Sequence, residues 1–86
     1  FDGVPAFDIN RNLLVGGVTF TSLCAEHSQV FGSKSELRRM AQGGGVSLNK
    51  KKIDDPEILI GEDQLLNDKY LLIQKGKKNY YLIRAV

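Results

Sequence analysis

Cys24 and His27 are the residues of this sequence whose types and spacing come closest to a catalytic pair. Residues three apart are neighbours on a helix, and a histidine beside a cysteine can generate a reactive thiolate. The same stripe carries Phe20 and Leu23, so we expect all four side chains to face the core. No third group that would orient the histidine is apparent. A structural role is therefore favoured, and a small thiol enzyme is the weakest alternative.

A run of three glycines, Gly43–Gly45, could in principle cradle a phosphate group with its backbone N–H groups. Phosphate loops of that kind precede a helix, whose free N–H groups and positive dipole end bind the anion. Here the glycines follow a helical pattern, at the negative end of the dipole. Glycine also suits the left-handed backbone of a helix C-cap. The run is interpreted as a helix stop.

Six acidic residues and no basic ones lie between positions 54 and 68, a density that could suggest a metal site. They lack the alternating acid spacing and the central glycine of a calcium loop. We interpret them as a solvated negative face and predict no metal. These acids are Asp54, Asp55, Glu57, Glu62, Asp63 and Asp68.

Positive charge is concentrated in two segments. Positions 34 to 52 hold six Lys or Arg residues and one acid, and the chain from position 69 onward holds five more and no acid. Arginine suits bidentate contact with phosphate, and lysine supplies a mobile point charge. With their polar neighbours, these residues predict a site for a polyanion. The predicted site consists of Lys34, Ser35, Arg38, Arg39, Gln42, Asn49, Lys50, Lys51, Lys52, Lys75, Lys77 and Lys78.

Two helices should position the first part of this site. Ser33 and Glu36 form a capping box, in which the Ser33 hydroxyl accepts from the N–H of Glu36 and the Glu36 carboxylate reaches back. In the helix that follows, apolar residues fall on one side and polar residues on the other. The inward set is Leu37, Met40 and Ala41, and the outward set is Ser35, Arg38, Arg39 and Gln42. An earlier helix is expected within 19–27, capped by Thr19 or Thr21.

Strand patterns dominate the second half of the chain. Val46 and Leu48 lead into a turn at Asn49-Lys50, from which a partner strand returns. Residues 58–60 predict another short strand or a packed loop. The runs 70–74 and 80–83 predict a hairpin with a basic loop. Adjacent Tyr80 and Tyr81 must point to opposite sides, so one belongs to the core and the other offers a partly exposed ring that can stack.

The fold class expected from these elements is α+β, with two short helices followed by a small, mainly antiparallel sheet. Eighty-six residues make one small domain. We expect residues 1–17 to form an extended linker or sheet-edge segment, and residues 18–86 to form the core.

The sequence also bounds the setting in which the chain works. No apolar run approaches the roughly 20 residues that span a bilayer, and no secretory signal opens the chain. A single cysteine fits a reducing compartment. The sequence therefore predicts a cytoplasmic protein without membrane contact, and the start at Phe1 suggests a fragment of a longer one.

The segment Ser33 to Asn49 resembles the RNA-binding motif shared with ribosomal protein S-four, in which a helix ends in glycine and a Val-x-x-Asn strand and turn follow. Nearly the whole chain resembles the C-terminal domain of bacterial tyrosyl-tRNA synthetases. The resemblance is carried by Val4-Pro5, Gly16-Gly17, Lys69–Ile73 and Gly76–Ile83. Lys50 and Leu37 depart from the motif, which commonly has glycine and alanine there.

The resemblance implies an S-four-like, tRNA-binding appendage that holds tyrosine tRNA at its long variable arm and toward the anticodon stem. A separate N-terminal domain, absent from this sequence, would activate tyrosine with ATP and Mg and would form a homodimer. The fragment itself would need no cofactor and carry no catalytic residue. Two alternatives stay open: an RNA-binding appendage of another RNA enzyme such as a pseudouridine synthase, and a protein-docking module with opposed acidic and basic faces.

Overall fold

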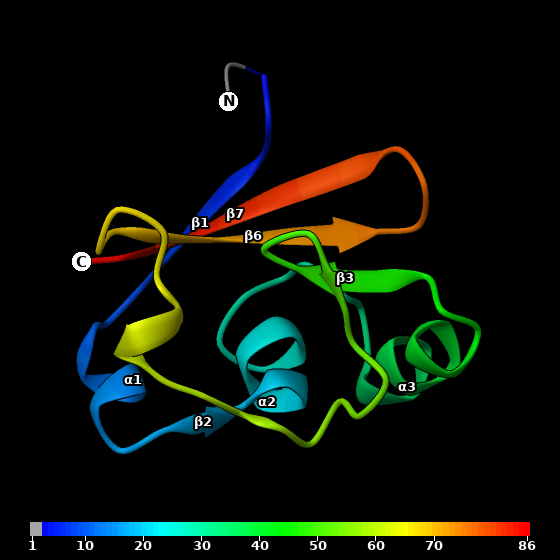
Figure 1. Cartoon of the computed structure of the whole chain (residues 1–86), viewed down its shortest axis with the longest axis horizontal. Coiled ribbons are helices and arrows are strands. Elements are labelled where there is room, and N and C mark those ends of the chain that lie inside the picture. The colour runs from blue at the N-terminus through cyan, green and yellow to red at the C-terminus, as the bar shows by residue number, and fades with distance from the viewer. Residues whose placement is uncertain (1–2) are drawn as a thin grey trace.

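The computed structural model describes residues 3–86, and Figure 1 shows their arrangement. Positions 1 and 2 of the predicted N-terminal edge segment lie outside the described residues. The elements, in chain order, are β1 (Ala6–Ile9), α1 (Asn12–Val15), β2 (Val18–Thr19), α2 (Phe20–Ala25), α3 (Lys34–Gln42), β3 (Val46–Leu48), β4 (Lys51–Lys52), β5 (Leu59–Ile60), the 3-10 helix η1 (Glu62–Gln64), β6 (Tyr70–Lys75) and β7 (Asn79–Ala85).

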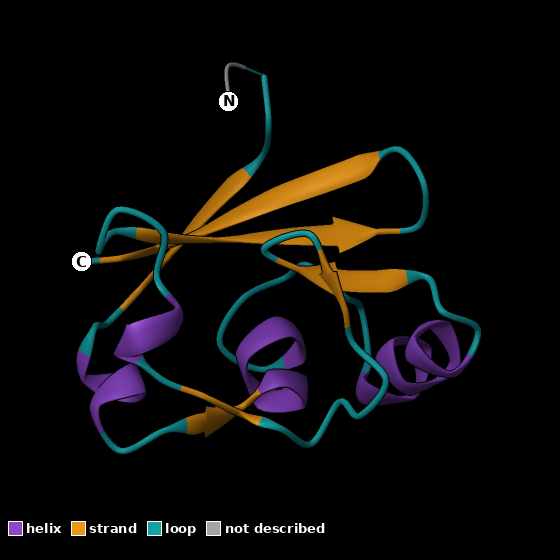
Figure 2. Ribbon diagram, in the orientation of Figure 1, coloured by secondary structure: helices purple, strands orange, loops and turns teal. Residues whose placement is uncertain are grey.

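A five-stranded sheet in the order β1-β7-β6-β3-β4 forms one layer of the molecule, and the helices cover one of its faces (Figure 2). β1 pairs in parallel with β7, and the other neighbours are antiparallel. The α+β class predicted from the sequence is confirmed. Beyond the prediction, the structure adds α1 and the small antiparallel sheet of β2 and β5.

The core lies between this sheet and the helices. In β6, Leu71 and Ile73 are fully buried on the helix-covered face, and Ile83 of β7 lies opposite Leu71. Because side chains alternate along a strand, Leu72 and Leu82 point to the opposite face, which we call the outer face. They pack there apart from the main core cluster.

Helix α2 begins with a capped first turn. The N–H of Ser22 donates to the Thr19 hydroxyl at 3.2 Å, which selects Thr19 over Thr21 as the N-cap. The helix ends at Ala25, two residues before His27. His27 is consequently exposed, so the expectation that it faces the core is wrong, whereas Cys24 is buried as expected.

Helix α3 has the start and the stop that the sequence predicts. The N–H of Glu36 donates to the Ser33 hydroxyl at 3.1 Å, and the Glu36 carboxylate accepts from the N–H of Gly32 at 3.5 Å. At the other end Gly44 has φ +77°, its N–H donates to the carbonyl of Ala41, and the N–H of Gly45 donates to that of Met40. This pattern is a Schellman C-cap, so the glycines end the helix.

Candidate nucleic-acid interface

Two basic turns flank the short strand β3, one at each of its ends. The β3–β4 turn consists of Asn49 and Lys50, with φ of +51° and +69°, which is the backbone of a type I′ turn. The β6–β7 turn holds Lys77 and Lys78. Strand β3 pairs with both β4 and β6, and the N–H of Gly76 donates to the carbonyl of Gly45 at 2.6 Å. The turns therefore belong to one continuous surface.

Lys52 joins this surface to the end of helix α3. A Cβ placed on Gly44 would lie 2.7 Å from Cε and 2.9 Å from Nζ of Lys52. The lysine side chain thus crosses the glycine backbone, in space that any other residue at position 44 would fill. Lys51 points to the opposite side of the short strand and lines a hollow with Ile53 and Ile58. Lys51 and Lys52 consequently lie on opposite sides of the β3–β4 hairpin.

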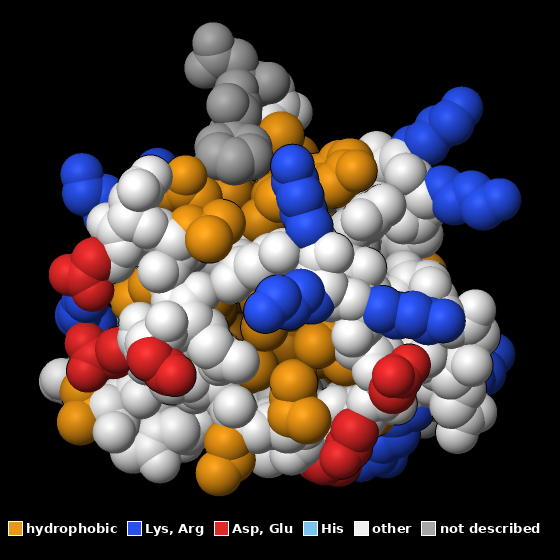
Figure 3. Space-filling model, in the orientation of Figure 1, with side chains coloured by type: hydrophobic (Ala, Val, Ile, Leu, Met, Phe, Trp, Pro, Cys, Tyr) orange, Lys and Arg blue, Asp and Glu red, His pale blue; other side chains and the backbone are white. Residues whose placement is uncertain are grey.

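Six of the predicted basic residues are exposed and have no ion-pair partner among residues 3–86. We call them the basic surface. The basic surface consists of Arg39, Lys50, Lys51, Lys52, Lys77 and Lys78. In Figure 3, Lys and Arg side chains stand over the β3–β4 hairpin and beside the β6–β7 turn, while Asp and Glu side chains form one group at the left edge and another at the lower right. Ser35 and Gln42 are also exposed, on the outward side of α3.

Three other predicted cations hold carboxylate partners. Arg38 donates to Glu57 at 3.1 Å, and Lys34 pairs with Glu26. The ammonium of Lys34 holds the pKa of the Glu26 carboxyl below its usual range. Exposed pairs of this type contribute little stability, about 0 to 1 kcal/mol. The two carboxylates do, however, neutralise part of the positive charge that the sequence analysis attributed to the predicted polyanion site.

Lys75 is the most enclosed of the predicted cations. Its ammonium lies 2.9 Å from the Glu36 carboxylate, donates to the carbonyl of Val30 at 3.2 Å and sits 5.0 Å from the ring centre of Phe31. The Lys75 hydrogen bond, followed by that of the Gly32 N–H, lowers the pKa of Glu36. Lys75 therefore links β6 to the start of α3, and its charge is largely committed to that link.

Asn49 is half-buried, and its side chain is engaged inside the protein. Its amide NH2 donates to the carbonyl of Gln64 at 2.6 Å, and its amide oxygen accepts from the N–H of Leu72 at 3.0 Å. The Asn49 N–H also donates to the carbonyl of Leu72 at 2.7 Å. This residue positions the lysines that follow it by joining their turn to β6 and η1.

The acidic segment has its own internal partner in Arg11. The guanidinium donates to the Glu62 carboxylate at 2.8 Å, to the carboxylate of Asp68 and to the Asp68 carbonyl at 2.9 Å. These contacts, that with Glu62 first, raise the pKa of Arg11. Among residues 3–86, no three His, Cys, Asp or Glu side chains are grouped as a metal site requires.

Cys24 and His27 do not form a reactive pair. Cys24 is buried, and burial raises the pKa of its thiol, which disfavours the thiolate. His27 is exposed beyond the end of α2.

Sequence reasoning left Asn79 and Tyr80 out of the predicted site, although it noted a ring available to stack. Both are exposed at the start of β7, next to Lys77 and Lys78. Tyr81 is the inward ring of the pair and stacks on Phe7 with centroids 6.2 Å apart. The register of the β6–β7 hairpin was the signal that could have placed Tyr80 beside the predicted lysines.

The fold and the surface together define a small α+β domain with an exposed basic surface around strand β3 and the end of α3. Residues 1–83 match the family described as "Tyrosine--tRNA ligase SYY-like C-terminal domain". The match covers nearly the whole chain, so the chain belongs to this family.

Curated relatives agree with the family match. The chain is 51% identical over 85 residues to a tyrosine–tRNA ligase of Parabacteroides distasonis, and 53% identical over 85 residues to one of Bacteroides fragilis strain YCH46, covering 99% of this chain in each case. A tyrosine–tRNA ligase of Flavobacterium johnsoniae is 37% identical over 86 residues. The chain spans about 20% of the length of each of these relatives. No helix within residues 3–86 has the length and apolarity to cross a membrane.

Proposed function

We propose that this chain is the tRNA-binding domain of a tyrosine–tRNA ligase and that the basic surface holds tyrosine tRNA. An N-terminal domain of the same protein would then attach tyrosine to the bound tRNA with ATP and Mg, and would form the homodimer. This work would take place in the cytoplasm. The observation that carries the proposal is the pair of lysine-bearing turns at the two ends of strand β3, in a chain of this family.

The chemistry of the surface favours phosphate contact over base reading. Five of its six cations are lysines on turns or at strand ends, where they supply mobile charge with little directional demand. Contacts of this type position a structured RNA by its backbone and shape. Because Lys34 and Arg38 hold carboxylate partners, we expect them to contribute less to RNA binding than the six residues of the basic surface.

The salt dependence of tRNA binding tests this proposal. If about five phosphates are neutralised, log affinity should fall against log salt with a slope of about −3.5 to −4.5. Lys52→Gln in strand β4 and Lys77→Gln in the β6–β7 turn should each reduce the slope by about one unit. Fluorescence anisotropy with labelled tyrosine tRNA at several salt concentrations measures both quantities.

Lys69→Gln is the matched control. It removes the same charge from an exposed lysine at the opposite end of β6 from the β6–β7 turn. This variant should keep the wild-type slope. Equal losses in all three variants, or binding that ignores salt, would contradict the proposal and favour the protein-docking alternative.

A further inference from the structure

The edge of β7 is open where the strand begins. β1 pairs with β7 only from Leu82 onward, and the N–H of Leu82 donates to the carbonyl of Pro5 at 2.9 Å. Main-chain groups two residues apart on a strand point the same way. The N–H and C=O of Tyr80 therefore face the side on which β1 has already diverged, and no strand occupies that position within residues 3–86.

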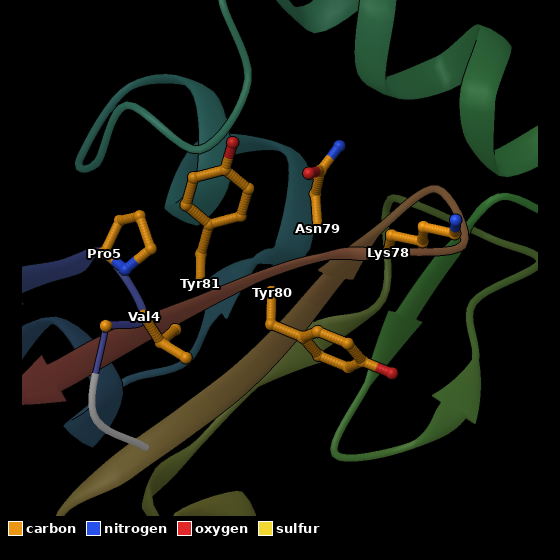
Figure 4. Close-up of a pocket in the computed structure, with 7 residues that line it drawn as sticks. Val4, Pro5, Lys78, Asn79, Tyr80 and Tyr81 are labelled. Atoms are coloured by element: carbon orange, nitrogen blue, oxygen red, sulfur yellow. The ribbon is translucent and has the colours of Figure 1, made fainter.

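A cleft lies along this open edge. Its walls are Gly3–Pro5 on one side and Lys78–Tyr81 on the other, and its volume is about 230 Å³. Figure 4 shows Val4 and Pro5 beside the strand, with the rings of Tyr80 and Tyr81 directed to opposite sides of it. Pockets for drug-sized ligands are usually about 300 to 1,000 Å³, so this cleft suits a single ring-sized group.

Tyr80 extends the outer face of the sheet toward the basic surface. Tyr80 is 38% exposed, whereas Tyr81 packs inward against Phe7. Across the strands the register aligns four side chains in one row on the outer face. The row is Lys52, Ser47, Gln74 and Tyr80. With about 4.8 Å between neighbouring strands, the row extends about 14 Å from a lysine to an exposed ring.

We propose that this β7-edge cleft binds one unpaired nucleotide of an RNA held on the basic surface, an inference that rests on the proposed function. The base stacks on Tyr80, as bases commonly stack on exposed aromatic rings. The adjacent lysines, Lys77 and Lys78, attract its phosphate. The main-chain N–H and C=O of Tyr80 lie at the open edge of β7, where they can bond the edge of the base.

A peptide strand added to the open edge is the competing occupant, and the chemistry disfavours it. Only Asn79–Tyr81 are available for pairing, which is too short for a stable added strand, and Gly3–Pro5 limit the space. Lys77 and Lys78 are exposed beside the opening and have no ion-pair partner among residues 3–86, which favours an anionic group. An exposed ring, an open main-chain edge and positive charge together match a nucleotide.

Two RNA probes separate this cleft from the basic surface. One is a fully paired RNA hairpin, and the other is the same hairpin with a short single-stranded extension containing 2-aminopurine. In the wild-type chain the extension should raise affinity about tenfold and quench 2-aminopurine fluorescence, because stacking on an aromatic side chain contributes at that level. Tyr80→Ala should lose this gain and keep the affinity for the paired hairpin, and Tyr80→Phe should restore it.

Leu59→Ala is the matched control, because Leu59 is a large exposed apolar residue outside the cleft, 67% exposed on β5. This variant should retain the gain from the extension. An extension that adds nothing in the wild type, or an equal loss on both probes in Tyr80→Ala, would overturn the cleft proposal alone. Failure of the wild type to bind either probe would instead contradict the proposed function. If Tyr80→Ala does not fold, the 2-aminopurine signal of the wild type decides.

Discussion

Asn49 and Lys50 occupy the two central positions of the same turn for different physical reasons. Both have positive φ, a backbone that costs an L-residue roughly 1 to 2 kcal/mol. Asparagine tolerates it best after glycine, and the Asn49 side chain also makes two hydrogen bonds to distant segments. The Lys50 side chain makes no such bond within residues 3–86, so we expect it to contribute positive charge to the surface and not stability to the fold.

Replacing each of these residues by glycine should therefore have opposite effects. Asn49→Gly keeps the turn but loses both side-chain hydrogen bonds, and should destabilise the fold by about 1 to 3 kcal/mol. Lys50→Gly relieves the strained backbone and should be neutral or stabilising by up to ~1 kcal/mol, while weakening RNA binding. Urea unfolding followed by circular dichroism measures the stabilities. Equal destabilisation would show that turn geometry, and not the Asn49 bridge, dominates.

The sequence predicted which residues could form the site, but it did not predict the hydrogen bonds and ion pairs that some of them make with distant residues. Lysines at turns are exposed wherever the turn lies, and Lys50, Lys77 and Lys78 are exposed in the structure, while their contact with RNA stays a prediction. Lys75 is different because its ammonium lies near Val30 and Glu36, which are distant in sequence. Asn49 likewise depends on contacts with Gln64 and Leu72 that no local pattern specifies.

Elements with local signals were predicted, and those that depend on distant pairing were not. Thr19, Ser33 and the glycines after α3 act within one helical turn of themselves, so the starts of α2 and α3 and the end of α3 followed from the sequence, whereas the end of α2 did not. In contrast, β2 pairs with β5, and α1 lies between β1 and β2 with only Leu14 buried. A two-residue strand or a four-residue helix forms only where the surrounding fold stabilises it.

The contact between α3 and β6 predicts a specific pH dependence. Because Lys75 holds the pKa of Glu36 below its usual range, the stability that Glu36 contributes is present above its unfolded pKa, about 4.3. It is lost as pH falls through the lower pKa of the folded state. Glu36→Gln should therefore be less stable than wild type at neutral pH, with a difference that shrinks at acid pH.

Unfolding midpoints in urea at several pH values between neutral and about 3 test this expectation. Asp54→Asn is the control, since it removes an exposed carboxylate that has no ion-pair partner among residues 3–86. Its difference from wild type should not follow the pattern of Glu36→Gln. A constant deficit of Glu36→Gln at every pH would mean that the carboxylate acts through packing alone.

At the scale of the whole molecule, the chain sorts its charges along the sheet. Glu62 and Asp68 of the acidic segment are bound by Arg11, whose own N–H donates to the carbonyl of Val86, whereas Glu57 pairs with Arg38 of α3. The basic surface lies around β3, β4 and the β6–β7 turn. A net charge of +2 therefore understates the positive field that an approaching polyanion meets.

This sorted charge predicts that RNA binding and thermal stability are coupled through salt. A ligand that binds only the folded chain adds about 2.7 kcal/mol of stability at a concentration of 100 times Kd. For a domain of this size the melting temperature should rise on the order of 10 °C or more. Raising salt tenfold should lower the affinity by about four orders of magnitude and abolish the rise in melting temperature.

Melting curves of the chain with and without tRNA, at low and high salt, measure the effect. The chain alone at both salt concentrations is the control. A rise that persists in high salt would contradict an electrostatic interface, because binding through apolar contact would not release counterions.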